Sequence, residues 1–256
     1  MAAARARETA LAVVPAYNEA GTVGRVVRSL HQHAPQFDVL VIDDGSTDRT
    51  GDLAERAGAR VLRLPFNLGI GGAVQAGFAY AKENGYRCLV QVDGDGQHDP
   101  AEIGRLEGAL DADPTVDMVC GSRFLTGDYR YPAPISRRTG IHVFAYMLSR
   151  IVGQRVSDPT SGFRMYNRRA IELFARDYPH DYPEVEAVLM VHFHRLRMRE
   201  VPVRMYKRGG GASSITSGKS IYYMIKVLLA IVVGLVRARP VPEPGDDAPV
   251  AATSGI

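Results

Sequence analysis

Two aspartates separated by one glycine are the residues of this sequence most suited to chemistry. Asp93-Gly94-Asp95 follows an apolar run at 89–92 that is typical of a buried strand. Gly96 and Pro100 then break regular structure, so a turn at the strand's carboxyl end is predicted. Two carboxylates this close repel each other unless a positive charge compensates them. Mg²⁺ or Mn²⁺, which take oxygen ligands and are shared with substrate phosphates, would meet that need.

A second acidic pair strengthens this interpretation. Asp43 and Asp44 follow another apolar run at 37–42, and Gln97 and His98 extend the first cluster with hydrogen-bonding or metal-capable side chains. An Asp-Gly-Asp tripeptide alone also occurs in ordinary surface turns. Four carboxylates at the carboxyl ends of two strands, where open α/β sheets bind ligands, indicate a site instead.

The elements that must hold these acids alternate along the first half of the chain. Helix and strand alternation of this kind favours one Rossmann-like, mostly parallel sheet with helices on both faces, an α/β fold. We expect strands at 10–15, 37–42, 60–64, 89–92 and 116–120, and helices at 21–33, 46–57, 71–83, 101–110 and 141–152. Ser46 and Thr47 are the expected N-caps of the second helix. The glycine-rich run at 67–72 lacks the dinucleotide-binding spacing and is interpreted as a tight helix entry.

Composition excludes some function classes. The chain has 256 residues, 46% hydrophobic and 23% charged, with a net charge of +3, so general nucleic-acid binding is not indicated. Cys88 and Cys120 fall in expected core strands and are interpreted as buried thiols of a reducing compartment. Residues 1–9 show no secretion signal and are expected to be a flexible N-terminus. A catalytic domain at 10–216, an apolar helix at 217–239 and a disordered tail at 240–256 are expected to follow.

Four sequence blocks together resemble the family 2 glycosyltransferases with a GT-A fold. The blocks are residues 13–19 (VVPAYNE), 41–48 (VIDDGSTD), 67–69 (NLG) and 93–98 (DGDGQH). They are most similar to the branch that includes dolichol-phosphate mannosyltransferase and bacterial polyprenyl-phosphate glycosyltransferases, over residues 11 to about 214. The resemblance implies an inverting, metal-dependent transfer of a sugar from a UDP- or GDP-linked nucleotide-sugar to polyprenyl phosphate.

The resemblance also implies roles for individual residues on the donor side. Asp95 and Gln97 would bind the metal, and Arg208, in a glycine-rich basic segment, would contact the donor diphosphate, although a solvated loop arginine is the alternative. Ser213 would lie at the acceptor phosphate or diphosphate. The expected donor contacts are Pro15, Tyr17, Glu19, Asp43 or Asp44, Gly69, Asp93 and Arg208.

The acceptor half gives weaker signals. Arg138 lies at the start of an apolar helix, where a cation conflicts with the helix dipole unless an anion is bound. The resemblance implies that Arg123 and Arg138 bind the lipid phosphate; a solvated pair is the alternative. Asp158 could orient a sugar hydroxyl or act as a base, and Glu186 is either a site acid or only a dipole partner of its helix. Here the sequence departs from the mannosyltransferase pattern, so the donor sugar stays open.

The C-terminal region indicates a membrane surface. Residues 221–236 carry Lys226 as their only charge and are otherwise almost wholly apolar. This run is shorter than the ~20 apolar residues that a membrane-spanning helix needs. Tyrosines at one end and arginines at the other suit a membrane interface. A core or subunit-contact helix, in a homo-oligomer or with a membrane partner, is the alternative. We expect a protein peripheral to the cytoplasmic face of the membrane.

Two rival functions remain open from the sequence. A family 2 enzyme with a saccharide hydroxyl as acceptor would need a carboxylate base, from Asp158, Glu184 or Glu186. A nucleotide-sugar-binding partner subunit without turnover would need no base. The acids and Arg208 argue against the second, because a protein that only binds the donor has no use for groups that stabilise a leaving diphosphate.

Overall fold

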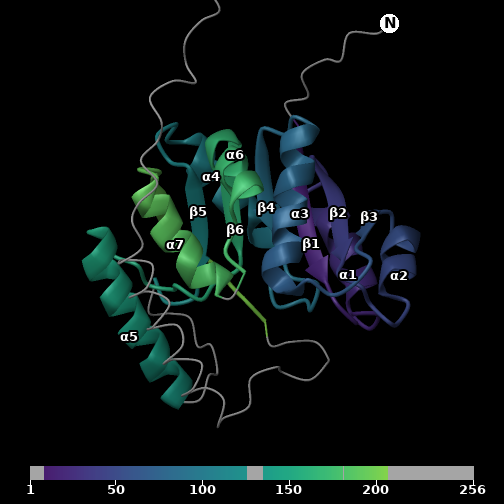
Figure 1. The fold of residues 1–256 in the computed structure, drawn as a ribbon, viewed down its shortest axis with the longest axis horizontal. Coiled ribbons are helices and arrows are strands. Elements are labelled where there is room, and N and C mark those ends of the chain that lie inside the picture. The colour runs from purple at the N-terminus through teal and green to yellow at the C-terminus, as the bar shows by residue number, and fades with distance from the viewer. Residues whose placement is uncertain (1–8, 126–134, 181, 207–256) are drawn as a thin grey trace, which may run out of the picture.

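The computed structural model describes residues 9–125, 135–180 and 182–206, and for 135–140 it describes the backbone alone. Its strands form one sheet in the order β3-β2-β1-β4-β6-β5-β7 (Figure 1). The strands are β1 Ala10–Ala16, β2 Phe37–Asp43, β3 Arg60–Arg63, β4 Cys88–Gln91, β5 Met118–Ser122, β6 Arg164–Asn167 and β7 Met198–Pro202. The helices are α1 Val23–His33, α2 Thr50–Arg56, α3 Gly69–Glu83, α4 Ile103–Asp111, α5 Ile135–Val152, α6 Arg168–Arg176 and α7 Pro183–Phe193, with a 3₁₀ turn at Pro100–Glu102.

The sheet is mostly parallel, as predicted. β1 pairs in parallel with β2 and β4, β2 with β3, and β5 with β7, while β6 runs antiparallel between β4 and β5. β6 and β7 were not predicted from the sequence. β6 is only four residues long and begins with an arginine, so it shows neither the length nor the apolar pattern of a buried strand.

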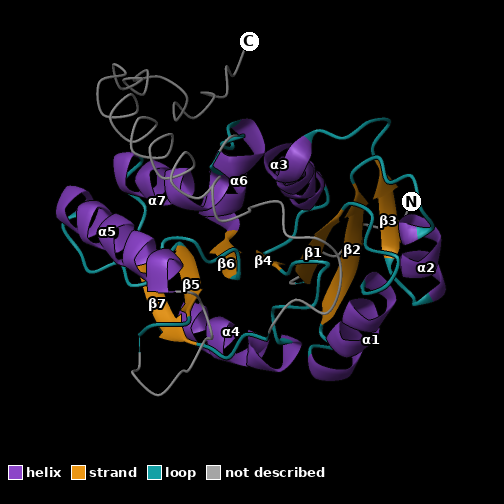
Figure 2. Cartoon of the chain, turned by 90° about the horizontal axis from the view of Figure 1, so that it is seen from below, coloured by secondary structure: helices purple, strands orange, loops and turns teal. Residues whose placement is uncertain are grey.

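Helices cover both faces of the sheet, which Figure 2 shows edge-on. On one face, Phe78 of α3 and Phe174 of α6 pack on Val13 and Leu89 in a core that also includes α7. On the other, Val27 of α1 packs in a second core with α4. β1 is buried along its whole length. A strand covered on both faces is apolar throughout and does not alternate, which is why the sequence pattern predicts it well.

The predicted start of the second helix needs correction. α2 begins at Thr50, and its N-cap residue makes no side-chain capping bond, so Ser46 and Thr47 are not caps. Instead the Ser46 hydroxyl accepts the Asn18 N–H at 3.0 Å, and the Thr47 N–H donates to Asn18 Oδ1 at 2.9 Å. The two residues therefore join neighbouring loops.

The thiols of Cys88 and Cys120 are buried as predicted, and burial raises the pKa of both to about 12.

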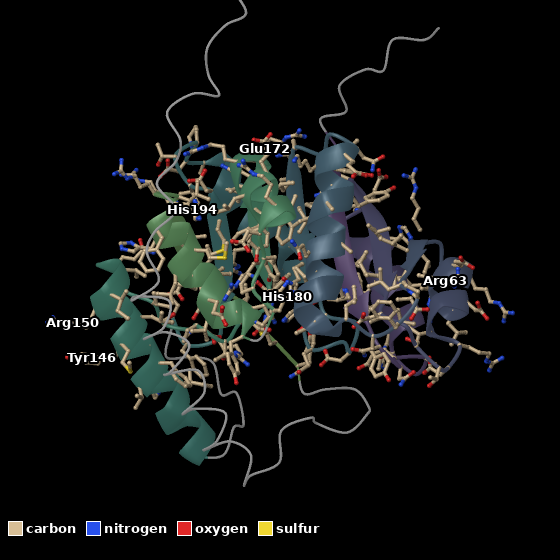
Figure 3. The ribbon with its side chains drawn as sticks, viewed as in Figure 1. Arg63, Tyr146, Arg150, Glu172, His180 and His194 are labelled. Carbon is tan, nitrogen blue, oxygen red and sulfur yellow. The ribbon has the colours of Figure 1, made fainter. Side chains whose placement is uncertain are left out.

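The C-terminal predictions fall outside the described residues. Within the part of the chain that the structure describes, no helix is both long enough and apolar enough to cross a membrane. The expected helix at 217–239, the tail at 240–256 and residues 1–8 lie beyond it. On the described surface, α5 carries exposed Val143 and Tyr146; Figure 3 shows Tyr146 and Arg150 on the side of α5 that faces away from the sheet.

Candidate active site

The ends of β1, β2 and β4 meet at one edge of the sheet and bring the predicted acids to one rim. Gly94 makes this approach possible, since its N–H donates to the Pro15 carbonyl at 3.3 Å. A Cβ at Gly94 would lie 3.1 Å from that oxygen and 3.2 Å from Ala16 Cβ, closer than most side chains tolerate. The Asp93-Gly94-Asp95 turn is thus packed against the end of β1.

The loops after β1 and β2 are joined by hydrogen bonds. The Glu19 N–H donates to Thr50 Oγ1 at 2.8 Å, and the Glu19 carboxylate accepts the Thr22 hydroxyl at 2.8 Å. Asn18, with a φ of 54°, bonds to Ser46 and Thr47 across the same gap. Tyr17 stays 47% exposed at the rim. Its ring is therefore available for a ligand, whereas Glu19 is buried and holds the loop.

Asp44 anchors a third loop. Its two oxygens accept the N–H groups of Leu68, at 2.7 Å, and Gly69, at 3.0 Å, where α3 begins. These N–H groups lie at a helix start, where they lack partners within the helix. Asp43 is also buried, and its Oδ1 accepts the Ser46 N–H at 3.1 Å. The structure brings Asp43, Asp44 and Gly69 together; their contacts with a nucleotide stay predictions.

His98 holds the turn that presents Asp93. The Asp93 N–H donates to His98 Nδ1 at 3.0 Å, which leaves the ring proton on Nε2, 3.6 Å from Asp93 Oδ2. Phe163 stacks on the imidazole with 4.9 Å between ring centroids. Burial lowers the pKa of His98 to about 4, so the ring is neutral. His98, metal-capable by residue type, therefore has a positioning role in the structure.

The predicted metal ligands lie on the same turn. Asp95 is largely buried, and its Oδ1 accepts the Gln97 N–H at 2.9 Å. Among the described residues, no group of three or more His, Cys, Asp or Glu side chains could hold a metal ion by itself. Two protein oxygens with substrate phosphates as the other ligands nonetheless fit Mg²⁺, which is often bound through one or two carboxylates.

Asp158 and Arg123 form a buried ion pair. Arg123 Nε lies 2.7 Å from Asp158 Oδ2, and Nη2 donates to Oδ1 at 2.8 Å. Asp158 is fully buried, and its own N–H donates to Glu200 at 3.1 Å. A carboxylate whose two oxygens face one guanidinium is a poor base, and the paired arginine has less capacity for a phosphate. The base and phosphate roles stay predictions, and the geometry favours positioning for both residues.

The first turn of α7 brings a further acid to the site. Glu186 Oε1 accepts the Tyr182 N–H at 3.3 Å, which fits its interpretation as a partner of the helix start. Although part of Glu184 is exposed, protein atoms crowd its carboxyl group, and this burial raises its pKa. The nearby charge of Asp93 acts in the same direction, and the charges of Arg164 and Arg123 oppose it. Glu184, named from the sequence only as an alternative base, thus lies within electrostatic range of Asp93.

The loop at 158–164 passes directly beside Asp93. A Cβ at Gly162 would lie 3.5 Å from each Asp93 carboxylate oxygen and 3.3 Å from Gln91 Nε2. Since glycine has no side chain, the loop can lie this close to the Asp93 carboxylate. Arg208 and Ser213 lie outside the described residues, and the side chain of Arg138, in the first turns of α5, is likewise not described.

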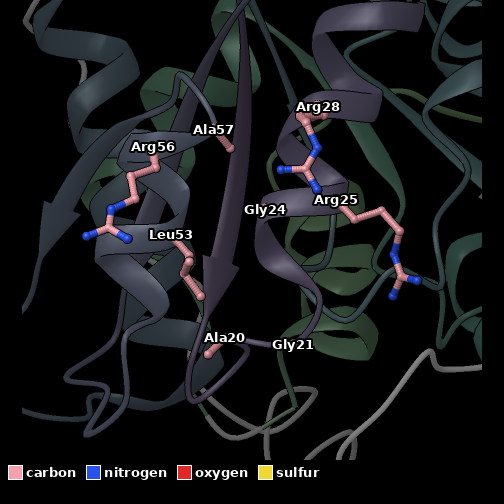
Figure 4. Close-up of a pocket in the computed structure, with 8 residues that line it drawn as sticks. All are labelled: Ala20, Gly21, Gly24, Arg25, Arg28, Leu53, Arg56 and Ala57. Atoms are coloured by element: carbon pink, nitrogen blue, oxygen red, sulfur yellow. The ribbon is translucent and has the colours of Figure 1, made fainter.

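A separate groove of about 360 Å³ lies between α1 and α2, away from the acids. Its lining includes Arg25, Arg28 and Arg56, which point in different directions in Figure 4. The guanidinium groups do not converge on one point. The groove therefore does not extend the site described above.

Comparison with known proteins decides the family. Residues 11–174 match the model of glycosyl transferase family 2. The chain belongs to this family. It is 34% identical to an undecaprenyl-phosphate mannosyltransferase from Micrococcus luteus, over 81% of this chain and 88% of the relative. It is 32% identical to a polyprenol monophosphomannose synthase from Mycolicibacterium smegmatis, over 88% of each.

Solved structures support the GT-A fold of this family 2 glycosyltransferase. A crystal structure of glucosyl-3-phosphoglycerate synthase from Mycobacterium tuberculosis, in complex with Mn²⁺, UDP and glucosyl-3-phosphoglycerate, matches with a TM-score of 0.66 and 21% identity. The match covers 94% of this chain and 83% of that one. The predicted family and fold are both confirmed, and the chain is an enzyme of the glycosyltransferase class.

Proposed function

We propose that this chain transfers a sugar from a nucleotide-sugar to polyprenyl phosphate, with a divalent cation, at the cytoplasmic face of the membrane. The observation that carries the proposal is the similarity to two enzymes named for undecaprenyl phosphate and polyprenol, over 88% of each relative's length. The family membership of the chain sets aside the partner subunit without turnover.

On the donor side, the joined loops after β1 and β2 form the nucleotide-binding region, with Tyr17 at the rim. Asp93 faces the sugar, and Asp95 and Gln97 hold Mg²⁺ or Mn²⁺; the Mn²⁺ and UDP in the crystallised relative support that choice. When bound, the cation neutralises negative charge on the departing diphosphate. Arg208 adds positive charge at the same leaving group.

In the transfer, a phosphate oxygen of the acceptor attacks C1 of the sugar. The bond from C1 to the diphosphate oxygen breaks, its electron pair leaves with the nucleoside diphosphate, and the configuration at C1 is inverted. A phosphate anion needs no strong base. Arg123 and Asp158 fix the loop beside the sugar, and Arg138 and Ser213 are the remaining candidates to bind the acceptor phosphate.

One observation favours a second candidate, a saccharide hydroxyl as acceptor. A hydroxyl nucleophile must lose a proton, and a base works best when its pKa lies near the working pH. Burial raises the pKa of Glu184 toward that range, and its carboxyl group lies within electrostatic reach of Asp93. Glu184 would be the base in that reaction.

The deciding experiment offers both acceptors to the full chain. Radiolabelled UDP- and GDP-sugars are supplied with Mn²⁺ and either undecaprenyl phosphate or a saccharide, with EDTA as the control. We expect label in the organic-solvent extract, only with the lipid and only with metal. Label in the saccharide alone would establish the second candidate and refute the first.

The membrane part of the proposal rests on the predicted helix at 217–239 and on the division into a catalytic domain at 10–216 and this helix. Burial of its apolar residues at the headgroup boundary is favourable by roughly 25 cal/mol for each Å² of apolar area removed from water. Arg237 and Arg239 add about 1 kcal/mol each near an anionic surface. The full chain is expected to float with anionic liposomes and to be partly released by high salt.

A chain ending at Ser217 provides the control. It should bind donor normally, fail to float and lose activity on a long-chain lipid acceptor. If truncation dissociates an oligomer and the full chain does not bind liposomes, the helix is a subunit contact. That result would contradict membrane binding.

A further inference from the structure

Arg164, the first residue of β6, is a buried cation with little around it to balance its charge. It is 1% exposed, and Nη2 donates to the Glu184 carbonyl at 2.6 Å and the Pro159 carbonyl at 3.3 Å. Among the described residues, its Nε and Nη1 have no hydrogen-bond partner in good geometry, the other polar groups nearest to the guanidinium being the Cys120 thiol and the Tyr166 hydroxyl, and no carboxylate forms a salt bridge with it. A buried charge with unmade hydrogen bonds is costly. A residue kept at that cost invites a functional explanation.

The groups opposite Arg164 in the sheet carry no charge that balances it. Cross-strand pairing places Gln91 of β4 and Cys120 of β5 directly opposite Arg164. Burial raises the pKa of the Cys120 thiol and of the nearby Tyr166 phenol to about 12, so both are neutral. Gln91 Oε1 is also buried without a partner. The floor of the site, the row of Gln91, Arg164 and Cys120 across the sheet, therefore carries the single positive charge of Arg164.

This positive floor lies directly behind the acids. Asp93 follows Gln91 by two residues, and Gly162, whose backbone borders the Asp93 carboxylate, precedes Arg164 by two. The Arg164 side chain extends from the sheet to the first turn of α7. A cation at a helix start is unfavourable unless anions are near, because the helix dipole is positive there too. The Glu184 carboxylate and an incoming phosphate are such anions.

The two Nη2 bonds join separate parts of the acceptor side. Pro159 belongs to the loop at 158–164, which carries the Asp158–Arg123 ion pair, and Glu184 belongs to α7. One guanidinium thus connects that loop with the helix that presents Glu184.

We propose that Arg164 is a positioning residue for sugar transfer, which holds the loop at 158–164 and the first turn of α7 together over Asp93. This inference rests on the proposed function. It predicts a specific separation of effects, because within the described chain the hydrogen bonds of Arg164 go to the loop at 158–164 and to α7, and none goes to the loops after β1 and β2.

The test replaces Arg164 with methionine and with lysine in the full chain. Methionine removes the charge and leaves no buried N–H unpaired, but the Pro159 and Glu184 carbonyl groups lose this donor. For Arg164→Met we expect a small change in Tm, an unchanged Kd for nucleotide with Mn²⁺, and a kcat lowered by about tenfold or more, as a misplaced reacting group causes. Arg164→Lys should recover part of kcat. The control is Arg168→Met, at an exposed arginine paired with Glu172, which should keep the wild-type kcat.

A lower Tm with normal kcat in Arg164→Met would show a purely structural role and overturn the inference. Equal losses of nucleotide affinity and turnover, or a lysine variant no better than methionine, would overturn it as well. Wild-type protein that transfers nothing to polyprenyl phosphate would count against the proposed function alone. The same variants are then compared for transfer to a saccharide or for donor hydrolysis, where an unchanged kcat in Arg164→Met would refute the role of Arg164.

Discussion

The buried neutral histidine of the Asp93 turn makes stability depend on pH in a calculable way. An unfolded histidine has a pKa of about 6.5, and burial lowers the pKa of His98 in the folded chain to about 4. Between these values the unfolded state binds a proton that the folded state does not, so the free energy of unfolding falls as the pH falls. A pKa difference of one unit between the folded and unfolded states corresponds to a free energy of about 1.4 kcal/mol. From pH 7.5 to pH 4.5, His98 should therefore account for a loss of about 2.5 kcal/mol.

The measurement compares wild type with His98→Gln, whose amide oxygen can still accept the Asp93 N–H but does not titrate. Urea unfolding is followed by far-UV circular dichroism at several pH values in EDTA, since the chain has no tryptophan. Other groups titrate in both proteins, and their contributions cancel in the difference. His31→Gln, at an exposed position, is the matched control.

The expected difference between wild type and His98→Gln is largest at neutral pH, shrinks as the pH falls from about 6.5, and is constant below about 4. A difference that stays constant from pH 7.5 to 4.5 would mean that His98 titrates equally in both states. That result would refute the buried neutral imidazole, and with it the account of how the Asp93 turn is held.

Three further predictions concern acids of the site. Asp95→Asn keeps the size of this largely buried side chain and the oxygen that accepts the Gln97 N–H, so it should greatly weaken Mn²⁺-dependent donor binding in calorimetry and leave Tm nearly unchanged; metal-stimulated activity in this variant would contradict the assignment. Asp44→Ala leaves two N–H groups at the start of α3 unpaired and should lower the free energy of unfolding by about 1–2 kcal/mol in urea titrations; no loss would contradict that anchor. Arg123→Met leaves the buried Asp158 carboxylate without its counter-charge and should lower the free energy of unfolding by about 3–5 kcal/mol. The double variant Arg123→Met/Asp158→Leu should regain most of that loss. Equal losses in single and double variants would argue against the pair.

The donor half of the fold could be predicted because its signals are local. β1, β2 and β4 are continuous apolar runs, each followed by a turn of polar and glycine residues, and the order of elements then implies a parallel sheet. Parallel strands bring their carboxyl ends to one edge, so Asp43 and Asp93 had to share a rim. What the sequence could not show is which oxygens the protein itself uses. Asp44 lies 24 residues before Leu68, and nothing local indicates that it accepts that N–H.

The acceptor half was harder to predict because its contacts join distant segments. Arg123 and Asp158 are 35 residues apart, and each alone resembles a ligand-binding residue. His98 was interpreted as metal-capable because the sequence does not show what covers its ring. The residue that stacks on it is Phe163, 65 positions further along the chain. An amphiphilic or charged side chain near a motif is equally compatible with a ligand and with a partner in the protein. Only the packed structure distinguishes the two.

The antiparallel strand β6 explains why these segments meet. A parallel strand between β4 and β5 would start at the opposite edge of the sheet and present its first residues far from Asp93. Because β6 is reversed, its first residue lies at the same edge as the ends of β4 and β5, opposite Gln91 and Cys120. The loop at 158–164 must therefore pass beside Asp93, and Gly162 leaves the room it needs. The same reversal places the Arg164 guanidinium at the start of α7, so one short strand aligns the loop at 158–164, the first turn of α7 and the Asp93 turn.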